Sequence, residues 1–469
     1  MKKYLLLFFL AYSISGIAQE LILKKGKVID VIPVNDSISE NYALYLPTNF
    51  ETTKEWPIIF VFDLENKGRQ ALRLLSASAE EEGFVLATPN NVNDSLSISK
   101  NILIASRMMK SVYETLPIQN NGVYTAGFSS GARFASLIPT FIRGINGVIS
   151  CGSSVANSEV LSIKKPFHFI GIVGNEDYNY TEMLSNQKVL NKLKFPNNLI
   201  LFNGGHIWPG NENVSKALQT FKLSSMAKGD IPKDSVYIKN AYENDFIKAK
   251  SLAVKNPLIA YGILKEMNTI YRPLMNIEPL QKYTSELKKT KIYRSHNRNQ
   301  NGVFFKETFI KEDYVYYLEE DIRTYNYNNL GWWKYQTDEL VKYNASPNLY
   351  ERQMGKRLDM YINDLIADNI DVIEAEAQID EEALNFLWML NTITKPKKYD
   401  SYLKVISFNA KVEDYGTALF YLEELLKNGY TNKSKLYSLE NTALFKITPE
   451  FNKVVSKYLK EARYQINEE

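Results

Sequence analysis

Short apolar runs alternate with longer amphipathic segments between about residues 20 and 225. The runs are rich in Val, Ile, Tyr and Phe, which predicts strands, and the spacing between the later runs predicts helices. This alternation is typical of helices covering a mainly parallel sheet, so we expect a doubly wound α/β domain. The expected strands are 27–34, 42–47, 57–63, 83–89, 122–127, 147–152, 167–174 and 198–203, and the expected helices are 68–82, 98–116, 131–142, 180–192 and 211–223.

Helical spacing replaces the strand pattern after a polar segment at 226–235, which we interpret as a linker. Residues 236–469 are therefore expected to form an all-α domain. Apolar side chains recur at three- and four-residue steps within 414–432, where Gly429 is expected to end a helix. This stretch resembles half of a tetratricopeptide unit, and a repeat array and a plain helical bundle both remain open.

The first residues have the pattern of an export signal. Lys2 and Lys3 precede an apolar run, and Ala18 provides a small-residue cleavage site. We assign 1–18 to a signal peptide and 19–225 to the α/β domain, and we expect a periplasmic or extracellular protein. The alternative, a membrane anchor, requires a longer apolar run of about 20 residues.

Length and composition narrow the functional classes. A chain of 469 residues exceeds what one hydrophobic core usually serves, so two domains are expected. The 56 basic and 53 acidic residues nearly balance, which predicts neither a nucleic-acid partner nor an anionic membrane partner. The single cysteine, Cys151, excludes an internal disulfide, and its apolar surroundings predict a small core residue.

The sequence GFSSG at 127–131 carries the sharpest chemical signal because it follows an expected strand and precedes an expected helix. In that context G-x-S-x-G predicts a nucleophile elbow, with Ser129 exposed on a tight turn and small residues allowing the chains to approach. The alternative is a glycine-rich turn that only packs.

The same turn predicts an oxyanion hole. The amide of Ser130 lies at the expected helix N-terminus, where the helix dipole favours a developing negative charge. A second donor is expected from the loop after the third strand, where Leu64 and Glu65 are the candidates.

Three histidines compete for the role of general base. His168 lies inside an apolar strand, which is typical of a core histidine, and His296 lies in a polar stretch that we interpret as a loop. His206 follows the last expected strand and precedes a helix, so it is the predicted base. The acid should fall between serine and histidine, and Asp177 is preferred over its neighbour Glu176, which we expect to be solvated.

The motifs GFSSGAR, GNEDYNY and GGHIWPG resemble the esterase branch of the α/β-hydrolases that includes feruloyl esterases and polyhydroxybutyrate depolymerases. The resemblance is closer still to exported bacterial members with tetratricopeptide-like C-terminal helices. It implies that Trp208 walls the substrate pocket beside His206. It also implies that a loop containing Asp63, Gly68 and Arg69 replaces the histidine-glycine element of other esterases.

Two further positions have competing interpretations. Asn90 and Asn91 end an expected strand, where they could contact substrate, orient the preceding loop or simply build the turn. The adjacent Trp332 and Trp333 cannot both face the same way on a helix, so one could pack between helices while the other contacts a ligand or the α/β domain.

These observations predict an exported serine hydrolase for carboxylic esters that forms an acyl-enzyme on Ser129 and requires no metal or organic cofactor. Small-molecule, carbohydrate or lipid esters are the expected substrates. A serine peptidase is a lesser alternative. The alternative from another class is an inactive hydrolase-fold scaffold whose helical half binds a protein partner.

Overall fold

The computed structural model describes residues 23–35, 37–157, 159, 161 and 166–463. The expected signal peptide at 1–18 lies outside these described residues and stays a prediction. The chain divides into two compact units. The first comprises the described residues up to Gly171 with Leu190–Asn198 and Gly210–Ser235, and the second comprises Ile172–Val189, Leu199–Pro209 and the described residues from Val236.

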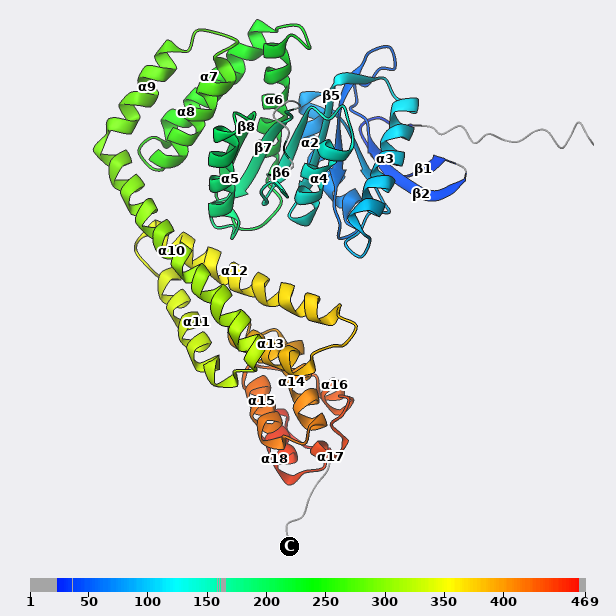
Figure 1. Cartoon of the computed structure of the whole chain (residues 1–469), viewed down its shortest axis with the longest axis vertical. Coiled ribbons are helices and arrows are strands. Elements are labelled where there is room, and N and C mark those ends of the chain that lie inside the picture. The colour runs from blue at the N-terminus through cyan, green and yellow to red at the C-terminus, as the bar shows by residue number, and fades with distance from the viewer. Residues whose placement is uncertain (1–22, 36, 158, 160, 162–165, 464–469) are drawn as a thin grey trace, which may run out of the picture. The chain divides into compact units, whose positions relative to one another are not determined.

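An eight-stranded sheet has the order β1-β2-β4-β3-β5-β6-β7-β8 (Figure 1). The pair β1–β2 and the pair β2–β4 are antiparallel, whereas β3 runs parallel to β4 and β5, and β5 runs parallel to β6. The doubly wound, mainly parallel sheet is therefore confirmed. The strands are β1 (Val28–Asn35), β2 (Ile38–Tyr45), β3 (Trp56–Phe62), β4 (Val85–Pro89), β5 (Ile118–Phe128), β6 (Gly147–Cys151), β7 (His168–Gly174) and β8 (Asn197–Phe202).

Helices cover both faces of the central strands. Because side chains alternate along a strand, Ile58, Phe60 and Phe62 of β3 share one face and join a core with apolar side chains of α3 and α4. On β5, Tyr124 stacks on Phe221 of α6 with ring centroids 4.1 Å apart. The helices of this part are α2 (Gly68–Glu82), α3 (Ile98–Thr115), α4 (Ser130–Phe141), α5 (Tyr180–Lys192) and α6 (Asn211–Lys228).

The end of α6 differs from the expected boundary. The helix continues to Lys228, so residues 226–228 form its last turn and not the start of a linker. Met226 is buried in this turn, and Gly229 ends the helix in a left-handed conformation with φ of 83°. Burial of Met226 favours the extra turn, whereas the expectation was based on the polar sequence that follows.

The chain beyond α6 is helical, as expected. Its α-helices are α7 (Ser235–Leu252), α8 (Pro257–Tyr271), α9 (Glu278–Lys289), α10 (Lys291–Thr324), α11 (Leu330–Asn344), α12 (Leu349–Glu374), α13 (Glu381–Thr394), α14 (Tyr399–Lys411), α15 (Tyr415–Lys427), α16 (Lys433–Tyr437), α17 (Ala443–Lys446) and α18 (Pro449–Leu459), with a 3₁₀ turn η1 (Tyr327–Asn329). Gly429 follows α15 with φ of 94°, as its expected role at a helix end requires.

Two predictions in this region have different outcomes. Trp333 is fully buried in a helical core, where its indole N–H donates to Asp321 at 2.8 Å, so packing between helices accounts for it. His296 lies within α10 and not in a loop, and that prediction was wrong. The helix begins before His296 because the Thr290 side chain caps it by accepting from the Tyr293 N–H, a local signal that apolar spacing does not reveal.

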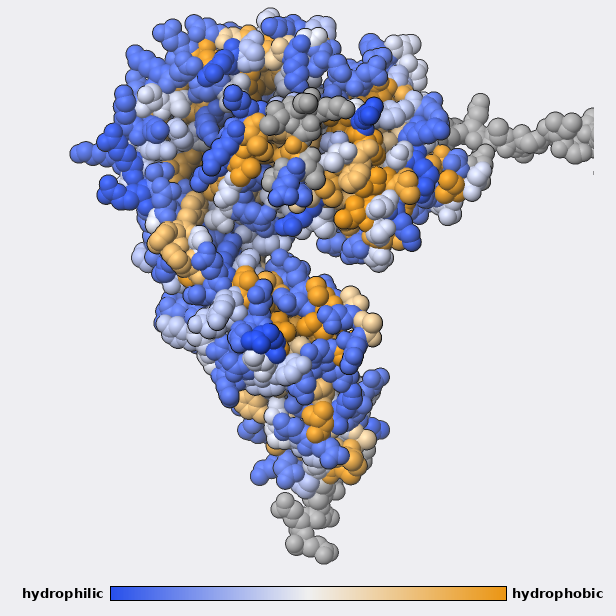
Figure 2. Space-filling view, viewed as in Figure 1, coloured by the Kyte–Doolittle hydropathy of each residue, from blue (hydrophilic) through white to orange (hydrophobic). Residues whose placement is uncertain are grey.

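Among the described residues, no helix is long and apolar enough to cross a membrane. On the face drawn in Figure 2, hydrophobic surface forms separate areas between hydrophilic ones. Cys151 is buried at the end of β6, which confirms that it is a core residue.

His168 is a core histidine of β7, as predicted. Its Nε2 lies 2.6 Å from Asn198 Oδ1, so Nε2–H is the donor, and the buried Nδ1 has no hydrogen-bond partner. Burial lowers the pKa of His168 to about 4. A proton would place a charge in the core, where Nδ1–H would find no acceptor.

This burial makes the free energy of unfolding depend on pH. Between about pH 4 and about pH 6.5, the unfolded chain binds a proton at His168 that the folded chain excludes, so stability falls as the pH is lowered through this window. His168→Gln retains a donor toward Asn198 but does not titrate. Denaturant unfolding across this window should show a weaker pH dependence for the variant, by about 3 kcal/mol in total. Identical pH profiles would contradict this assignment.

Candidate functional site: a strained serine turn and a buried histidine–aspartate pair

Ser129 lies on a tight turn between β5 and α4. Its backbone has φ of 52° and ψ of −121°, a region that non-glycine residues rarely adopt and that is commonly associated with functional sites. The Ser129 N–H donates to the carbonyl of Cys151 at 3.0 Å, and the Ser129 carbonyl accepts from Arg133 at 3.1 Å. The end of β6 and the first turn of α4 therefore hold the strained residue on both sides.

Close packing explains the two flanking glycines. A Cβ atom on Gly127 would lie 2.3 Å from the carbonyl carbon and oxygen of Gly131. A Cβ atom on Gly131 would lie 2.3 Å from the backbone oxygen of Phe62. Any larger residue at either position must move backbone, so the G-x-S-x-G pattern is required for the turn to form.

The expected oxyanion donors lie close to this turn in the first unit. Ser130 is the first residue of α4, so its N–H has no acceptor within the helix. In the loop after β3, the Glu65 N–H donates to Asp63 Oδ1 at 3.0 Å, and the Lys67 N–H donates to the same oxygen at 2.8 Å. Because Asp63 already engages the Glu65 amide, Leu64 is the better of the two candidates for a second donor.

Asn90 and Asn91 connect strand ends. The Asn90 amide donates to Asn41 Oδ1 at 2.6 Å and to the Asp30 carbonyl at 2.9 Å, and Asn91 Oδ1 accepts from the Asn41 N–H at 2.9 Å. Asn90 also receives a long hydrogen bond of 3.4 Å from Arg69. These contacts fit the turn-building and loop-orienting interpretations, and substrate contact stays a prediction.

Asp177 and His206 belong to the second unit and contact each other directly. Asp177 follows β7 and His206 follows β8, and His206 Nδ1 lies 2.9 Å from Asp177 Oδ2. The Asp177 side chain is 1% exposed and that of His206 is 16% exposed. The second carboxylate oxygen accepts the Asn179 N–H at 2.8 Å. An ionised carboxylate on Nδ1 fixes the tautomer in which Nε2 is the basic nitrogen.

The loops after β7 and β8 are packed backbone to backbone. The Asn175 amide donates to Asn203 Oδ1 at 2.7 Å, and the Glu176 N–H donates to the Gly204 carbonyl at 2.9 Å. A Cβ atom on Gly174 would lie 2.2 Å from Gly204 O. The separation of Asp177 from His206 therefore depends on a glycine at 174.

Tyr178 places an aromatic ring against the histidine. The ring centroids of Tyr178 and His206 are 4.6 Å apart, with an angle of 44° between the planes. Burial raises the pKa of the Tyr178 phenol, and the negative charge of Asp364, which also hydrogen-bonds it, raises it further. The neutral ring restricts where the imidazole can turn.

Helices of the C-terminal region hold the loop that carries Asp177. Arg357 of α12 is 1% exposed and donates to the Asn175 carbonyl at 2.7 Å, two residues before Asp177. Lys311 of α10 donates to the Tyr178 carbonyl at 2.8 Å, one residue after it. Two cations therefore grip the backbone on either side of the acid.

A single carboxylate compensates these two cations. Glu307 of α10 accepts from Arg357 Nε at 3.0 Å with both oxygens and lies 3.4 Å from Lys311 Nζ. Burial lowers the pKa of Lys311, and the charge of Glu307 opposes that shift. We call Glu307, Lys311 and Arg357 the buried ion cluster.

Further contacts extend along one stripe of α12. Lys356 forms an ion pair with Glu176 at 2.7 Å, so Glu176 is paired and not only solvated as expected. The Met360 side chain lies beside Gly205, the residue before His206. Asp364, one turn further, reaches Tyr178. The histidine–aspartate pair and the helical region thus form one compact unit, as its bounds indicate.

Other expected residues have separate places. Trp208 is half-buried two residues after His206. His296 Nδ1 lies 2.8 Å from the Tyr350 hydroxyl, and Arg133 donates to Ser153 at 3.0 Å, which fits its bracing interpretation. No group of three or more His, Cys, Asp or Glu that could hold a metal ion occurs among the described residues.

The strand order, the serine turn after β5, and the acid and histidine after β7 and β8 together define the architecture. The chain has the α/β-hydrolase fold. No family model matches its sequence, and no curated protein matches it either.

Several solved structures resemble part of the chain. An S-formylglutathione hydrolase from Staphylococcus aureus has 14% identity and a TM-score of 0.35, over 43% of this chain and 99% of its own. An esterase from Pyrobaculum calidifontis has 12% identity and a TM-score of 0.36, over 43% and 86%. The feruloyl esterase module from Clostridium thermocellum has 13% identity and a TM-score of 0.35, over 41% and 87%. These TM-scores are low, and the fold follows from the chain's own strand order.

The buried ion cluster was missed from the sequence. Glu307 and Lys311 are four residues apart on a polar helix, a spacing that usually indicates a solvated surface pair. The available signal was Arg357 in a helix whose neighbouring positions are apolar, since a buried arginine requires a partner.

Replacing Gly174 should separate the two loops. Because the added Cβ meets backbone of Gly204, Gly174→Ala is expected to lower the free energy of unfolding by about 1–3 kcal/mol. Gly210→Ala is the matched control, since nothing lies within 4 Å of its Cβ position. Denaturant unfolding of both variants tests this. Equal stabilities would contradict the close approach of the loops.

Breaking the buried ion cluster should cost more than breaking an exposed pair on the same helix. Glu307→Gln leaves Arg357 buried without its counter-charge, and we expect a loss of about 3–5 kcal/mol in unfolding free energy. Glu320→Gln removes the exposed pair with Arg323, whose side chain is 70% exposed, and should cost less than about 1 kcal/mol. Similar losses for both variants, measured by urea unfolding, would refute the cluster's importance.

Proposed function

We propose that the chain is a serine hydrolase of carboxylic esters, with Ser129 as nucleophile, His206 as general base and Asp177 as the acid that orients the base. The observation that carries the proposal is the backbone of Ser129, a non-glycine residue held at φ of 52° between a parallel strand and a helix. A nucleophile elbow requires this turn, and packing alone gives no reason to maintain the strain at a serine.

The hydrogen bond between Asp177 and His206 supports the proposal independently. A carboxylate bonded to Nδ1 raises the affinity of Nε2 for a proton and stabilises the imidazolium that forms when Nε2 accepts one. The order serine, aspartate, histidine along the chain is that of the α/β-hydrolases. The strands before these residues, β5, β7 and β8, lie in the same half of the sheet order, with β6 between β5 and β7.

The reaction begins with attack by Ser129 Oγ on the ester carbonyl carbon while its proton passes to His206 Nε2. The N–H groups of Ser130 and Leu64 stabilise the oxyanion of the tetrahedral intermediate. When the intermediate collapses, the bond to the leaving alcohol breaks and His206 protonates the alcohol. Water, deprotonated by His206, then attacks the acyl-enzyme, and release of the carboxylic acid restores Ser129.

The substrate class proposed is an acylated small molecule, carbohydrate or lipid. An ester needs only acyl transfer to Ser129 and protonation of an alcohol, steps that the proposed residues supply. If residues 1–18 act as a signal peptide, the enzyme meets such esters in the periplasm or outside the cell.

Labelling with a fluorophosphonate probe tests the nucleophile directly. The wild-type chain should be labelled covalently at Ser129 and should hydrolyse p-nitrophenyl butyrate, whereas Ser129→Ala should lose labelling and at least about 10³-fold in kcat. Ser99→Ala, in an exposed position of α3, is the matched control and should behave as wild type. Equal labelling of wild type and Ser129→Ala would remove Ser129 from the mechanism, and a wild type inert to both reagents would favour the inactive scaffold.

A further inference from the structure

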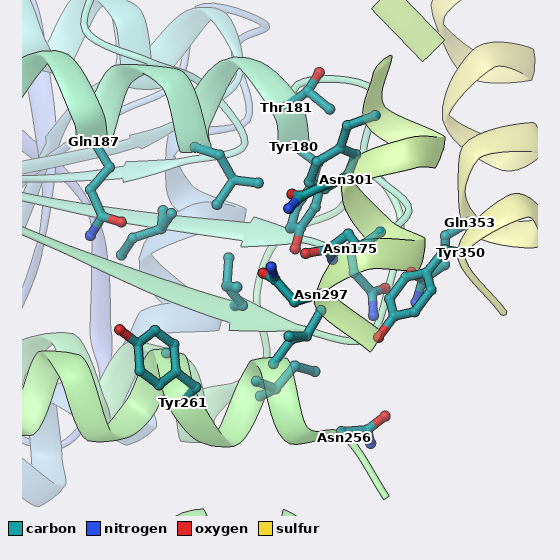
Figure 3. A pocket seen from close by; sticks show the side chains of 18 of the residues that line it. Asn175, Tyr180, Thr181, Gln187, Asn256, Tyr261, Asn297, Asn301, Tyr350 and Gln353 are labelled. Carbon is teal, nitrogen blue, oxygen red and sulfur yellow. The ribbon is translucent and has the colours of Figure 1, made fainter. Parts of the chain in front are cut away.

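A cavity of about 610 Å³ lies within the second unit, apart from the polar contacts of the histidine–aspartate pair. Its walls come from α5, α8 and α10, from β8, and from the beginning of α12. Figure 3 shows Asn297 and Asn301 directed from α10 toward Asn175 and Tyr180, with Tyr261 on α8 across the cavity. The volume falls in the range of about 300–1,000 Å³ that is usual for small-molecule sites.

Neutral carboxamides dominate the polar lining. Asn297, Gln300 and Asn301 come from one face of α10, Gln187 comes from α5, and Gln353 comes from α12. Each carboxamide has both a donor and an acceptor, so the lining matches a ligand whose neighbouring groups also donate and accept.

Charge is sparse in comparison. Of the described residues that line the cavity, only Lys188, Lys265 and Glu266 carry a charge, and Glu266 accepts a hydrogen bond from Gln187 at 2.9 Å. Two lysines beside one glutamate do not form the cation cluster that a phosphate or polycarboxylate ligand needs. A neutral ligand is therefore favoured.

Aromatic rings add flat apolar surface around the amides. Tyr180, Tyr261 and Tyr350 line the cavity. Phe305 also lines it although its side chain is 68% exposed, and Phe309 packs edge-on against Phe305 with ring centroids 4.7 Å apart. Such rings can cover the apolar C–H face of a pyranose while amides bind its hydroxyl groups.

The walls are already fixed without a ligand. The guanidinium of Arg357 lies 5.3 Å from the Tyr180 ring centroid and 5.6 Å from that of Phe304. The Tyr350 hydroxyl is held by His296 at 2.8 Å. A preformed site loses little side-chain freedom on binding, which favours affinity for a polar ligand.

We propose that this cavity binds a neutral saccharide. Vicinal hydroxyl groups alternate as donors and acceptors over short distances, which suits clustered carboxamides, and the pyranose face suits the tyrosine rings. A fatty acyl chain would leave the carboxamides without partners. The inference goes beyond the proposed ester hydrolysis, and it does not depend on the chemistry at Ser129.

Isothermal titration calorimetry on the full-length Ser129→Ala chain tests the proposal, because binding is then measured without turnover. The neutral probes are cellotetraose, xylotetraose, maltotetraose and triacetylchitotriose, and the comparison probes are tetragalacturonate and tetraalanine. We expect saturable binding of at least one neutral saccharide. Asn297→Ala combined with Asn301→Ala should raise its Kd about tenfold or more.

Two further variants separate binding from folding. Phe305→Ala removes an exposed ring and should weaken binding without lowering the melting temperature. Asn299→Ala is the matched control on α10, since Asn299 pairs with Asn348 outside the cavity lining, and its Kd should equal that of the parent. Binding of none of the neutral saccharides, preference for tetragalacturonate or tetraalanine, or unchanged affinity in the double variant would overturn the proposal.

Discussion

The carbonyl group of Asn175 accepts a hydrogen bond from a fully buried arginine, and the order of the second unit depends on that contact. Arg357 can remain charged in the interior because Glu307 compensates it, and Glu307 also lies within ion-pair distance of Lys311, which holds the carbonyl of Tyr178. Removing one member would leave a buried charge unpaired. The backbone on both sides of Asp177 is thereby fixed by helices far along the chain, and with it the hydrogen bond from Asp177 to His206.

The first unit depends on a different constraint, the strained turn at Ser129. Gly127 and Gly131 allow α4 to approach the ends of β3 and β5 closely enough for that turn to exist. Strain at the serine is maintained by hydrogen bonds to the end of β6 and within α4. Nucleophile and base are thus oriented by separate means, tight backbone packing for Ser129 and buried ionic contacts for His206.

Local signals explain which features were predictable from sequence. The G-x-S-x-G turn, the strand positions and the choice of Asp177 over Glu176 all depend on residues a few positions apart, and apolar period identifies most helices. His296 was misplaced because a capping threonine, and not an apolar stripe, starts its helix. Arg357 pairs with Glu307 across 50 residues and with Asn175 across 182, so no local pattern could reveal the buried ion cluster. The polar cavity arises in the same way, from side chains that only the fold brings together.

The central claim is that the helical region acts on ester hydrolysis through Asp177. A double-mutant cycle tests it most directly, with kcat for p-nitrophenyl butyrate measured for Lys311→Met, Asp177→Asn and the combined variant. The account predicts that Lys311→Met lowers kcat when Asp177 is present and has no further effect when Asp177 is replaced by Asn. Equal fold losses in both backgrounds would show that Lys311 acts independently of Asp177 and would contradict the account.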